Sequence, residues 1–151
     1  MAARLALAAP LLIIALAACW QATSLLRQDF SYAAAMTEVG FWGRADYRPA
    51  PAAIERTGRG IAALLQQAPA NPEYHALQAR YLAWRGYWAQ DAEVRLRLDA
   101  RALQAQYRAQ QLRPAHRQGW QKVLEYASHT LDGAAAMAEA SRRIAVLQPA
   151  A

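Results

Sequence analysis

The sequence predicts an all-α protein, with an N-terminal transmembrane helix followed by a small bundle of antiparallel helical hairpins. Alanine is abundant, and no stretch shows sustained alternation of apolar and polar residues, so helix is the expected structure throughout. Apolar residues recur at steps of three and four along most of the chain. The strongest such stripe consists of Tyr74, Leu77, Tyr81, Trp84 and Trp88.

An apolar run extends from Leu5 to Leu26 between Arg4 and Arg27, and it contains the single cysteine, Cys19. As a helix it would be roughly 33 Å long, close to the roughly 30 Å thickness of a bilayer's hydrocarbon core. We therefore expect residues 5–26 to enter a membrane.

Three interpretations of this run remain open. It is a cleaved signal if small residues near Ala18 form the cleavage site. It is a lipoprotein signal if Cys19, which follows Leu16, Ala17 and Ala18 as in a lipobox, is acylated. It is a retained anchor if the helix continues past Cys19, and the helix-compatible residues 28–36, without Gly or Pro, favour this third interpretation.

We predict a division into an anchor or signal segment (1–26), a juxtamembrane helix and turn (27–50) and a helical domain (51–151). Gly40 and Gly43 end the first helix, and Pro51 begins the next, which Pro69 ends. The apolar face of that second helix carries Ile54, Gly58, Ile61 and Leu65.

Asn71 is the expected cap of a helix that begins at Pro72, with Glu73 in its first turn. Gly86 in this helix leaves room for a partner helix to approach closely. A second helix follows Asp91 and stops at Pro114. The final two helices, with an apolar face from Trp120 to Leu131 on the first of them, are separated at Asp132–Gly133 and end near Leu147.

The two final hairpins resemble tetratricopeptide repeats. Leu112-Arg113-Pro114 and Leu147-Gln148-Pro149 are 35 residues apart, near the repeat period of about 34 residues. Trp120, the Ala136 and Ala140 pair and Pro149 match repeat positions, whereas the internal Leu-Gly pair of that family is absent. This resemblance implies a short stack of hairpins that the flanking helices cap.

No residues form a recognisable catalytic or metal-binding pattern. His75, His116 and His129 are too scattered for a metal pair, and Ser128 and His129 are adjacent, hence on different helix faces. Gly58-Arg59-Gly60 lacks the strand and lysine of a phosphate-binding loop. We expect a protein that is not an enzyme and has no metal or cofactor.

The net charge is +6, and the basic residues are 16 arginines and one lysine. One crowded region contains Arg95, Arg97, Arg101, Arg108, Arg113 and Arg117. Such a row can hold phosphate, carboxylated sugar or an acidic partner through forked hydrogen bonds, or it is simply a solvated face.

Aromatic residues supply the candidate partner-binding surface. Tyr87 lies off the stripe that ends at Trp88, so it is the aromatic expected to face a ligand, with Arg85 beside it. Trp42 and Arg44 form a second candidate surface. The alternative is structural: the stripe is core, and the aromatics of the 41–44 turn seal the first helix onto the bundle.

The order of features resembles exopolysaccharide-biosynthesis accessory proteins of the VpsP type from Gram-negative bacteria. The matching elements are the apolar segment, residues 37–44, Tyr47-Arg48-Pro49, Asn71-Pro72-Glu73-Tyr74, Tyr81, residues 84–88, Arg113-Pro114 and Trp120. The resemblance spans nearly the whole chain and supplies no catalytic residues. It implies a membrane-bound accessory protein of polysaccharide synthesis or export.

We therefore expect a non-catalytic scaffold, anchored in the bacterial inner membrane by a single pass over residues 5–26, with its body in the periplasm. Its partner would be an envelope protein, for example of the polysaccharide-synthesis machinery, and no nucleic acid is expected. The alternatives are direct binding of an acidic glycan by the arginine and aromatic surface, or a lipoprotein scaffold acylated at Cys19.

Overall fold

A computed structural model describes residues 2–148 of the chain, with side chains from Ile13 onward. The predicted all-α class is confirmed: the described residues form six helices and no strand. The helices are α1 (Ala2–Phe41), α2 (Pro51–Gln67), α3 (Pro72–Trp88), α4 (Ala92–Leu112), α5 (Arg117–Ala127) and α6 (Ala134–Val146).

The prediction of a transmembrane helix over residues 5–26, and with it that of a single-pass inner-membrane protein, is contradicted. Within the part of the chain that the structure describes, no helix is both long enough and apolar enough to cross a membrane. The described apolar side chains before Gln21 cover residues 13–20, roughly 12 Å of helix. Thr23 and Ser24 then interrupt the run. The side chains of residues 5–12 lie outside the described part.

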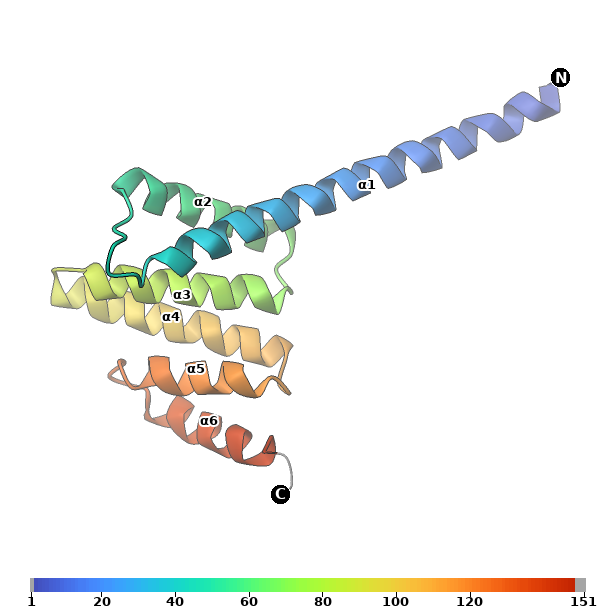
Figure 1. Ribbon diagram of the computed structural model, residues 1–151. Helices are drawn as coiled ribbons and strands as arrows, with labels where there is room; N and C mark the ends of the chain where they lie inside the picture. The colour runs from blue at the N-terminus through green and yellow to red at the C-terminus, as the bar shows by residue number, and fades with distance from the viewer. Residues whose placement is uncertain (1, 149–151) are drawn as a thin grey trace.

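The helices form a layered stack in which sequence neighbours are spatial neighbours (Figure 1). α3 and α4 pack most extensively, α5 pairs with α6, and α4 also packs on α5. Short connections, such as residues 89–91, force consecutive helices to run antiparallel. The body is therefore a series of hairpins with its layers in chain order.

α1 belongs to the body only at its C-terminal end. One core buries Ala35 and Val39 of α1, and Trp42 just past its end, together with Ile61 of α2 and Leu77 of α3. Toward its N-terminus α1 projects away from the other helices (Figure 1), and Trp20 there is 79% exposed. The helix is continuous through residue 26, where we placed a division, and its turn follows at residues 42–50.

A second, smaller core joins α5 and α6. Trp120, Val123 and Ala140 are its buried residues. The Trp120 indole Nε1–H donates to the carbonyl of Pro114, with 2.8 Å between the heavy atoms, so the tryptophan also fixes the turn that enters α5.

Local signals set the helix starts where the sequence places them. The Asn71 side chain accepts from the Glu73 N–H (2.9 Å), and Asp91 caps α4 by accepting from Glu93 N–H (2.7 Å) and Val94 N–H (3.0 Å). One boundary differs. α5 ends at Ala127, so Leu131 lies in the following turn and is exposed instead of sharing the apolar face of Trp120.

Gly86 provides the close helix approach that its position predicts. It is buried against α4, where Asp99 and the Cβ of Leu98 are its nearest neighbours. Because α3 and α4 pack this closely, residues of α4 line the hollow beside α3.

Candidate binding groove

One face of the stack is hollowed into a groove of about 1280 Å³. The turn after α1 forms one rim, α3 and α5 form the walls, and the start of α4 lies between them. We call this surface the groove; its principal lining side chains are Trp42, Arg44, Tyr47, Arg48, Arg80, Trp84, Tyr87, Trp88, Arg95, Asp99, Lys122, Glu125, Tyr126 and His129.

The α3 wall is aromatic. Trp84 stacks on Trp88 with ring centroids 5.6 Å apart, and Tyr87 meets Trp84 edge-on at the same separation. Tyr87 is 75% exposed, whereas Trp84 and Trp88 are half-buried. The wall therefore offers one accessible phenol backed by two rings that packing holds in place.

The rim is rigid because hydrogen bonds and ring contacts tie the turn to α1. Glu38 accepts from the Trp42 indole N–H (3.0 Å) and from the Tyr47 hydroxyl (2.7 Å). The hydrogen bond between the Tyr47 hydroxyl and Glu38 is the main cause that raises the pKa of Tyr47. Arg44 lies over the Phe41 ring, 4.8 Å from its centroid, so its charge is held at the edge of the groove.

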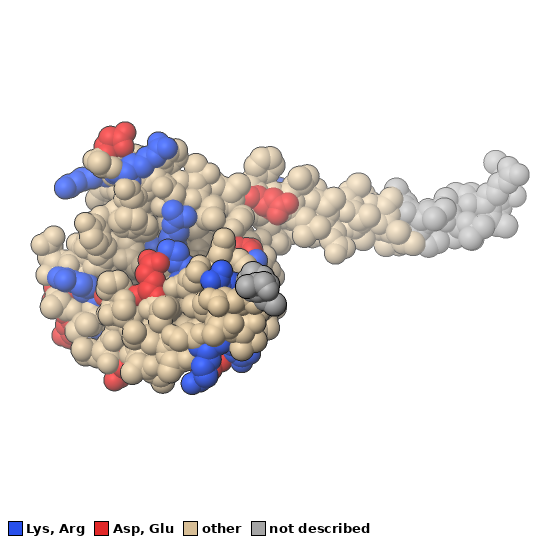
Figure 2. Space-filling view, turned by 60° about the horizontal axis from the view of Figure 1, so that its bottom comes forward, with Lys and Arg blue, Asp and Glu red and all other residues tan. Residues whose placement is uncertain are grey.

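Cations outnumber acids in the groove. Lys122 and Glu125 pair with each other at 2.6 Å. Four arginines line the groove and form no ion pair among the described residues. They are Arg44, Arg48, Arg80 and Arg95. Figure 2 shows both basic and acidic side chains distributed over the body, and an acidic side chain on the described part of the projecting helix. The groove is thus an anion-attracting surface.

Two titratable groups lie deeper between the walls. Burial raises the pKa of Asp99, an effect that His129 and Arg95 partly offset. Burial also raises the pKa of Tyr126 to about 12, so this phenol stays protonated at physiological pH. Asp99 forms no ion pair within the described chain, and its Oδ1 faces Gly86 of α3.

The structure brings three of the four predicted partner-binding residues to this groove: Trp42, Arg44 and Tyr87. Trp42 is only 2% exposed and packs against Tyr81 and Trp88, so its main role is to hold the wall. Arg85 lies apart from the groove, with its guanidinium 5.9 Å from the Tyr81 ring centroid.

The arginine row does not form one face. Arg95 lines the groove, Arg97 pairs with Glu93 at 3.5 Å, and Arg113 pairs with Glu73. Arg101 and Arg108 line a second hollow on the other side of α3 and α4. Helical geometry explains the split, because at 100° per residue Arg101 and Arg108 lie roughly 120–140° around the helix from Arg95.

Residues of α5 and of the turn that follows it complete the groove, although no pattern in the sequence points to them. Lys122, Tyr126 and His129 stand opposite α3 because α4 packs on both helices. A four-residue periodicity from 122 to 126 is the only local signal, and it does not reveal which helix faces it.

Cys19, the predicted acylation site, is exposed on α1. Acylation there stays a prediction. Among the described residues, no group of three or more His, Cys, Asp or Glu side chains is arranged to hold a metal ion.

No family model matches the chain, and neither a curated protein nor a solved structure matches it.

Proposed function

We propose that the protein is a non-catalytic adaptor whose groove binds an acidic segment of a partner protein. The observation that carries this proposal is the pairing of an exposed aromatic, Tyr87, with four arginines that lack acidic partners in the described chain. Tyrosine, tryptophan and arginine dominate the energetics of protein interfaces, because each buries a large area and still forms directed polar contacts.

The size of the groove favours a chain segment over a small molecule. Its volume of about 1280 Å³ exceeds the roughly 300–1,000 Å³ of typical small-molecule pockets. An extended or helical segment could place carboxylates near Arg44 and Arg80 and an apolar side chain against Trp84. The proposed setting, an accessory role in polysaccharide assembly, rests on the resemblance in sequence alone.

The rim and wall make separate contributions that can be tested. We expect synthetic acidic peptides with one central aromatic residue to shift the indole N–H resonances of Trp84 and Trp88. Arg44→Gln and Tyr87→Ala should each weaken binding at least fivefold, and affinity should fall with added salt because exposed charges are screened. Arg56→Gln is the matched control: Arg56 is exposed on α2, does not line the groove and should leave affinity unchanged.

Two outcomes would contradict the proposal. One is a set of groove resonances that no acidic peptide shifts, and the other is equal loss in the Arg56 and Arg44 variants. An acidic polysaccharide that displaces the peptides and binds more tightly would replace the protein partner by a glycan, which is the alternative function.

A further inference from the structure

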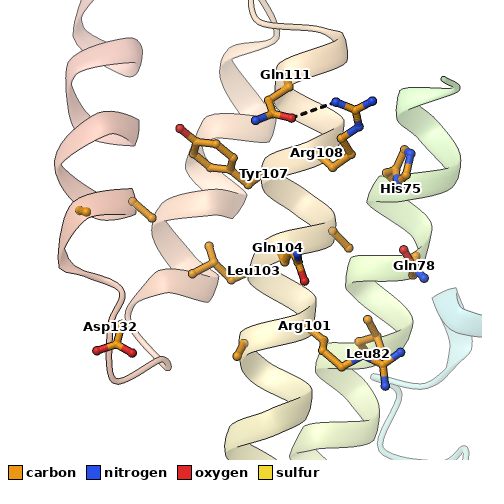
Figure 3. Close-up of a pocket in the computed structure, with 14 residues that line it drawn as sticks. His75, Gln78, Leu82, Arg101, Leu103, Gln104, Tyr107, Arg108, Gln111 and Asp132 are labelled. Atoms are coloured by element: carbon orange, nitrogen blue, oxygen red, sulfur yellow. Dashed lines mark hydrogen bonds between the residues drawn. The ribbon is translucent and has the colours of Figure 1, made fainter. Parts of the chain in front are cut away.

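A second hollow of about 820 Å³ lies on the opposite side of α3 and α4 from the groove. We call it the α4 cavity. Figure 3 shows Arg101, Gln104, Arg108 and Gln111 along α4, with His75, Gln78 and Leu82 along α3 facing them and Asp132 at the turn before α6. The groove-lining and cavity-lining residues of α3 lie roughly 180° apart around the helix.

The α4 cavity contains two arginines without carboxylate partners. Arg101 and Arg108 are exposed, two helical turns apart, and neither forms an ion pair within the described chain. Arg108 donates one hydrogen bond to the Gln111 side chain at 3.0 Å, which orients its guanidinium along the helix. By contrast, Arg97 on the same side of α4 pairs with Glu93 and lies outside the cavity.

Neutral groups that both donate and accept hydrogen bonds surround these two charges. Gln78, Gln104 and Gln111 each carry an amide oxygen and an amide NH₂. The Nε2 atom of His75 donates to the Pro69 carbonyl oxygen at 2.8 Å, and this hydrogen bond fixes the ring that lines the cavity. Asp132 is the only carboxylate among the described lining residues.

We propose that the α4 cavity binds an acidic saccharide, a sugar that carries a carboxylate or a phosphate group. A guanidinium binds either oxyanion through two parallel hydrogen bonds. Sugar hydroxyls both donate and accept, as the surrounding amides do, whereas an apolar ligand would leave those amides without partners. Leu103 and the half-buried Tyr107 supply an apolar surface for the carbon face of the ring.

The proposal is independent of the groove and separable from it by experiment. Four probes are titrated into the full-length protein by NMR: trigalacturonate, glucose 1-phosphate, glucose and glutarate. The two acidic sugars should shift the side-chain amide resonances of Gln78 and Gln104. Glucose, which lacks the oxyanion, and glutarate, which lacks the hydroxyls, should each bind at least tenfold more weakly.

The variant Arg101→Gln/Arg108→Gln should weaken acidic-sugar binding at least tenfold. Arg97→Gln removes a charge from the same helix outside the cavity, and Tyr87→Ala alters the groove; both should leave that affinity unchanged. Circular dichroism verifies the fold of each variant. Preference for trigalacturonate assigns the site to a uronate, and preference for glucose 1-phosphate assigns it to a sugar phosphate.

Three results would overturn the proposal. These are no amide shift with either acidic sugar, equal affinity for glutarate, and equal loss in the Arg97 variant, because the last two would indicate general attraction of anions by a basic surface. None of them bears on peptide binding in the groove, so the two proposals can fail separately.

Discussion

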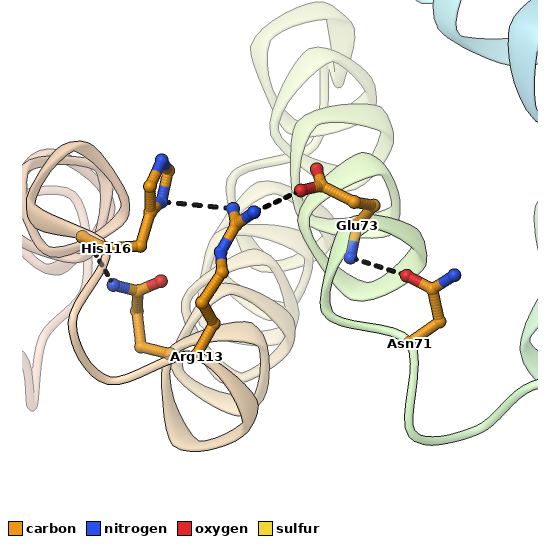
Figure 4. Close-up of polar contacts among 5 residues, drawn as sticks. Asn71, Glu73, Arg113 and His116 are labelled. Carbon is orange, nitrogen blue, oxygen red and sulfur yellow. Dashed lines mark hydrogen bonds and ion pairs between the residues drawn. The ribbon is translucent and has the colours of Figure 1, made fainter.

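Arg113 at the end of α4 forms an ion pair with Glu73 at the start of α3, 40 positions earlier in the chain (Figure 4). The same guanidinium donates to Nδ1 of His116 at 3.1 Å, in the turn that leads into α5. Asn71 meanwhile caps α3 through the Glu73 N–H. One side chain thus connects three consecutive helices at one end of the stack.

We expect this ion pair to contribute measurably to stability. The two side chains are 38% and 42% exposed, so the coupling energy in a Glu73→Gln, Arg113→Gln double-mutant cycle should be about 0.5–1 kcal/mol. Urea unfolding of the four proteins measures it. The control is the pair of Arg59 and Glu55, whose side chains are 76% and 72% exposed. Its coupling energy should be about 0.3 kcal/mol. Equal coupling energies in the two cycles would mean that the partly buried pair between helices stabilises the fold no more than an exposed pair within one helix.

Gly43 holds the position of the groove wall. A Cβ added there would lie 2.9 Å from Cζ2 of Trp84, so the ring must shift. Gly43→Ala should therefore weaken peptide binding severalfold and alter the near-ultraviolet circular dichroism. Gly40→Ala is the matched control: its Cβ meets nothing within 4 Å, and it should stabilise α1 by about 0.5–1 kcal/mol without affecting binding. Unchanged affinity in Gly43→Ala would mean that Trp84 does not contact the ligand.

Gly86 sets the distance between α3 and α4. A Cβ there would lie 2.5 Å from Oδ1 of Asp99. Because Oδ1 is the far end of a side chain that can rotate, the overpacking penalty should be only about 1 kcal/mol and should cancel the gain of roughly 1 kcal/mol in helix propensity, so Gly86→Ala should leave the free energy of unfolding nearly unchanged. Gly60→Ala, with open space around it in α2, should raise it by about 0.5–1 kcal/mol. A Gly86 variant as stable as the Gly60 variant would contradict the close packing.

Asp99 should destabilise the folded protein at neutral pH. Burial raises its folded-state pKa above the unfolded value of 3.8, so ionisation as pH rises through the folded pKa costs stability. Asp99→Asn should therefore have a higher Tm than the wild type at pH 7, and the difference should shrink as the pH falls below 3.8, where the carboxyl becomes protonated in both states. Thermal unfolding between pH 3 and 8 tests this. A lower Tm for Asp99→Asn at pH 7 would show instead that His129 and Arg95 stabilise the carboxylate.

Local sequence signals predicted the fold well wherever a few neighbouring residues determine the structure. Asn71, Pro72 and Asp91 act within one helical turn, so the starts of α3 and α4 could be located from the sequence. The end of α5 could not, because Leu131 continues the apolar spacing although the chain turns after Ala127. The apolar run misled for a different reason: in the described part its apolar side chains cover only residues 13–20 before Gln21, and Thr23 and Ser24 interrupt it further.

The candidate site was less predictable because it depends on how helices stack. The exposure of Tyr87 followed from its offset from the apolar stripe of α3. The burial of Trp42 agrees with the structural alternative for the 41–44 turn, in which its aromatics seal the first helix onto the bundle, and the sequence alone did not decide between that alternative and an exposed surface. Lys122 and His129 reach the groove only through the packing of α5 on α4.

The way α1 joins the body has a mechanical consequence. It is one helix of 40 residues, roughly 60 Å long, and its C-terminal end is fixed by Val39 and Trp42 beside the groove rim. A flexible tether would let the groove explore many orientations. This helix instead acts as a lever arm: whatever immobilises its far end also sets the direction in which the groove faces and the distance at which it meets a ligand.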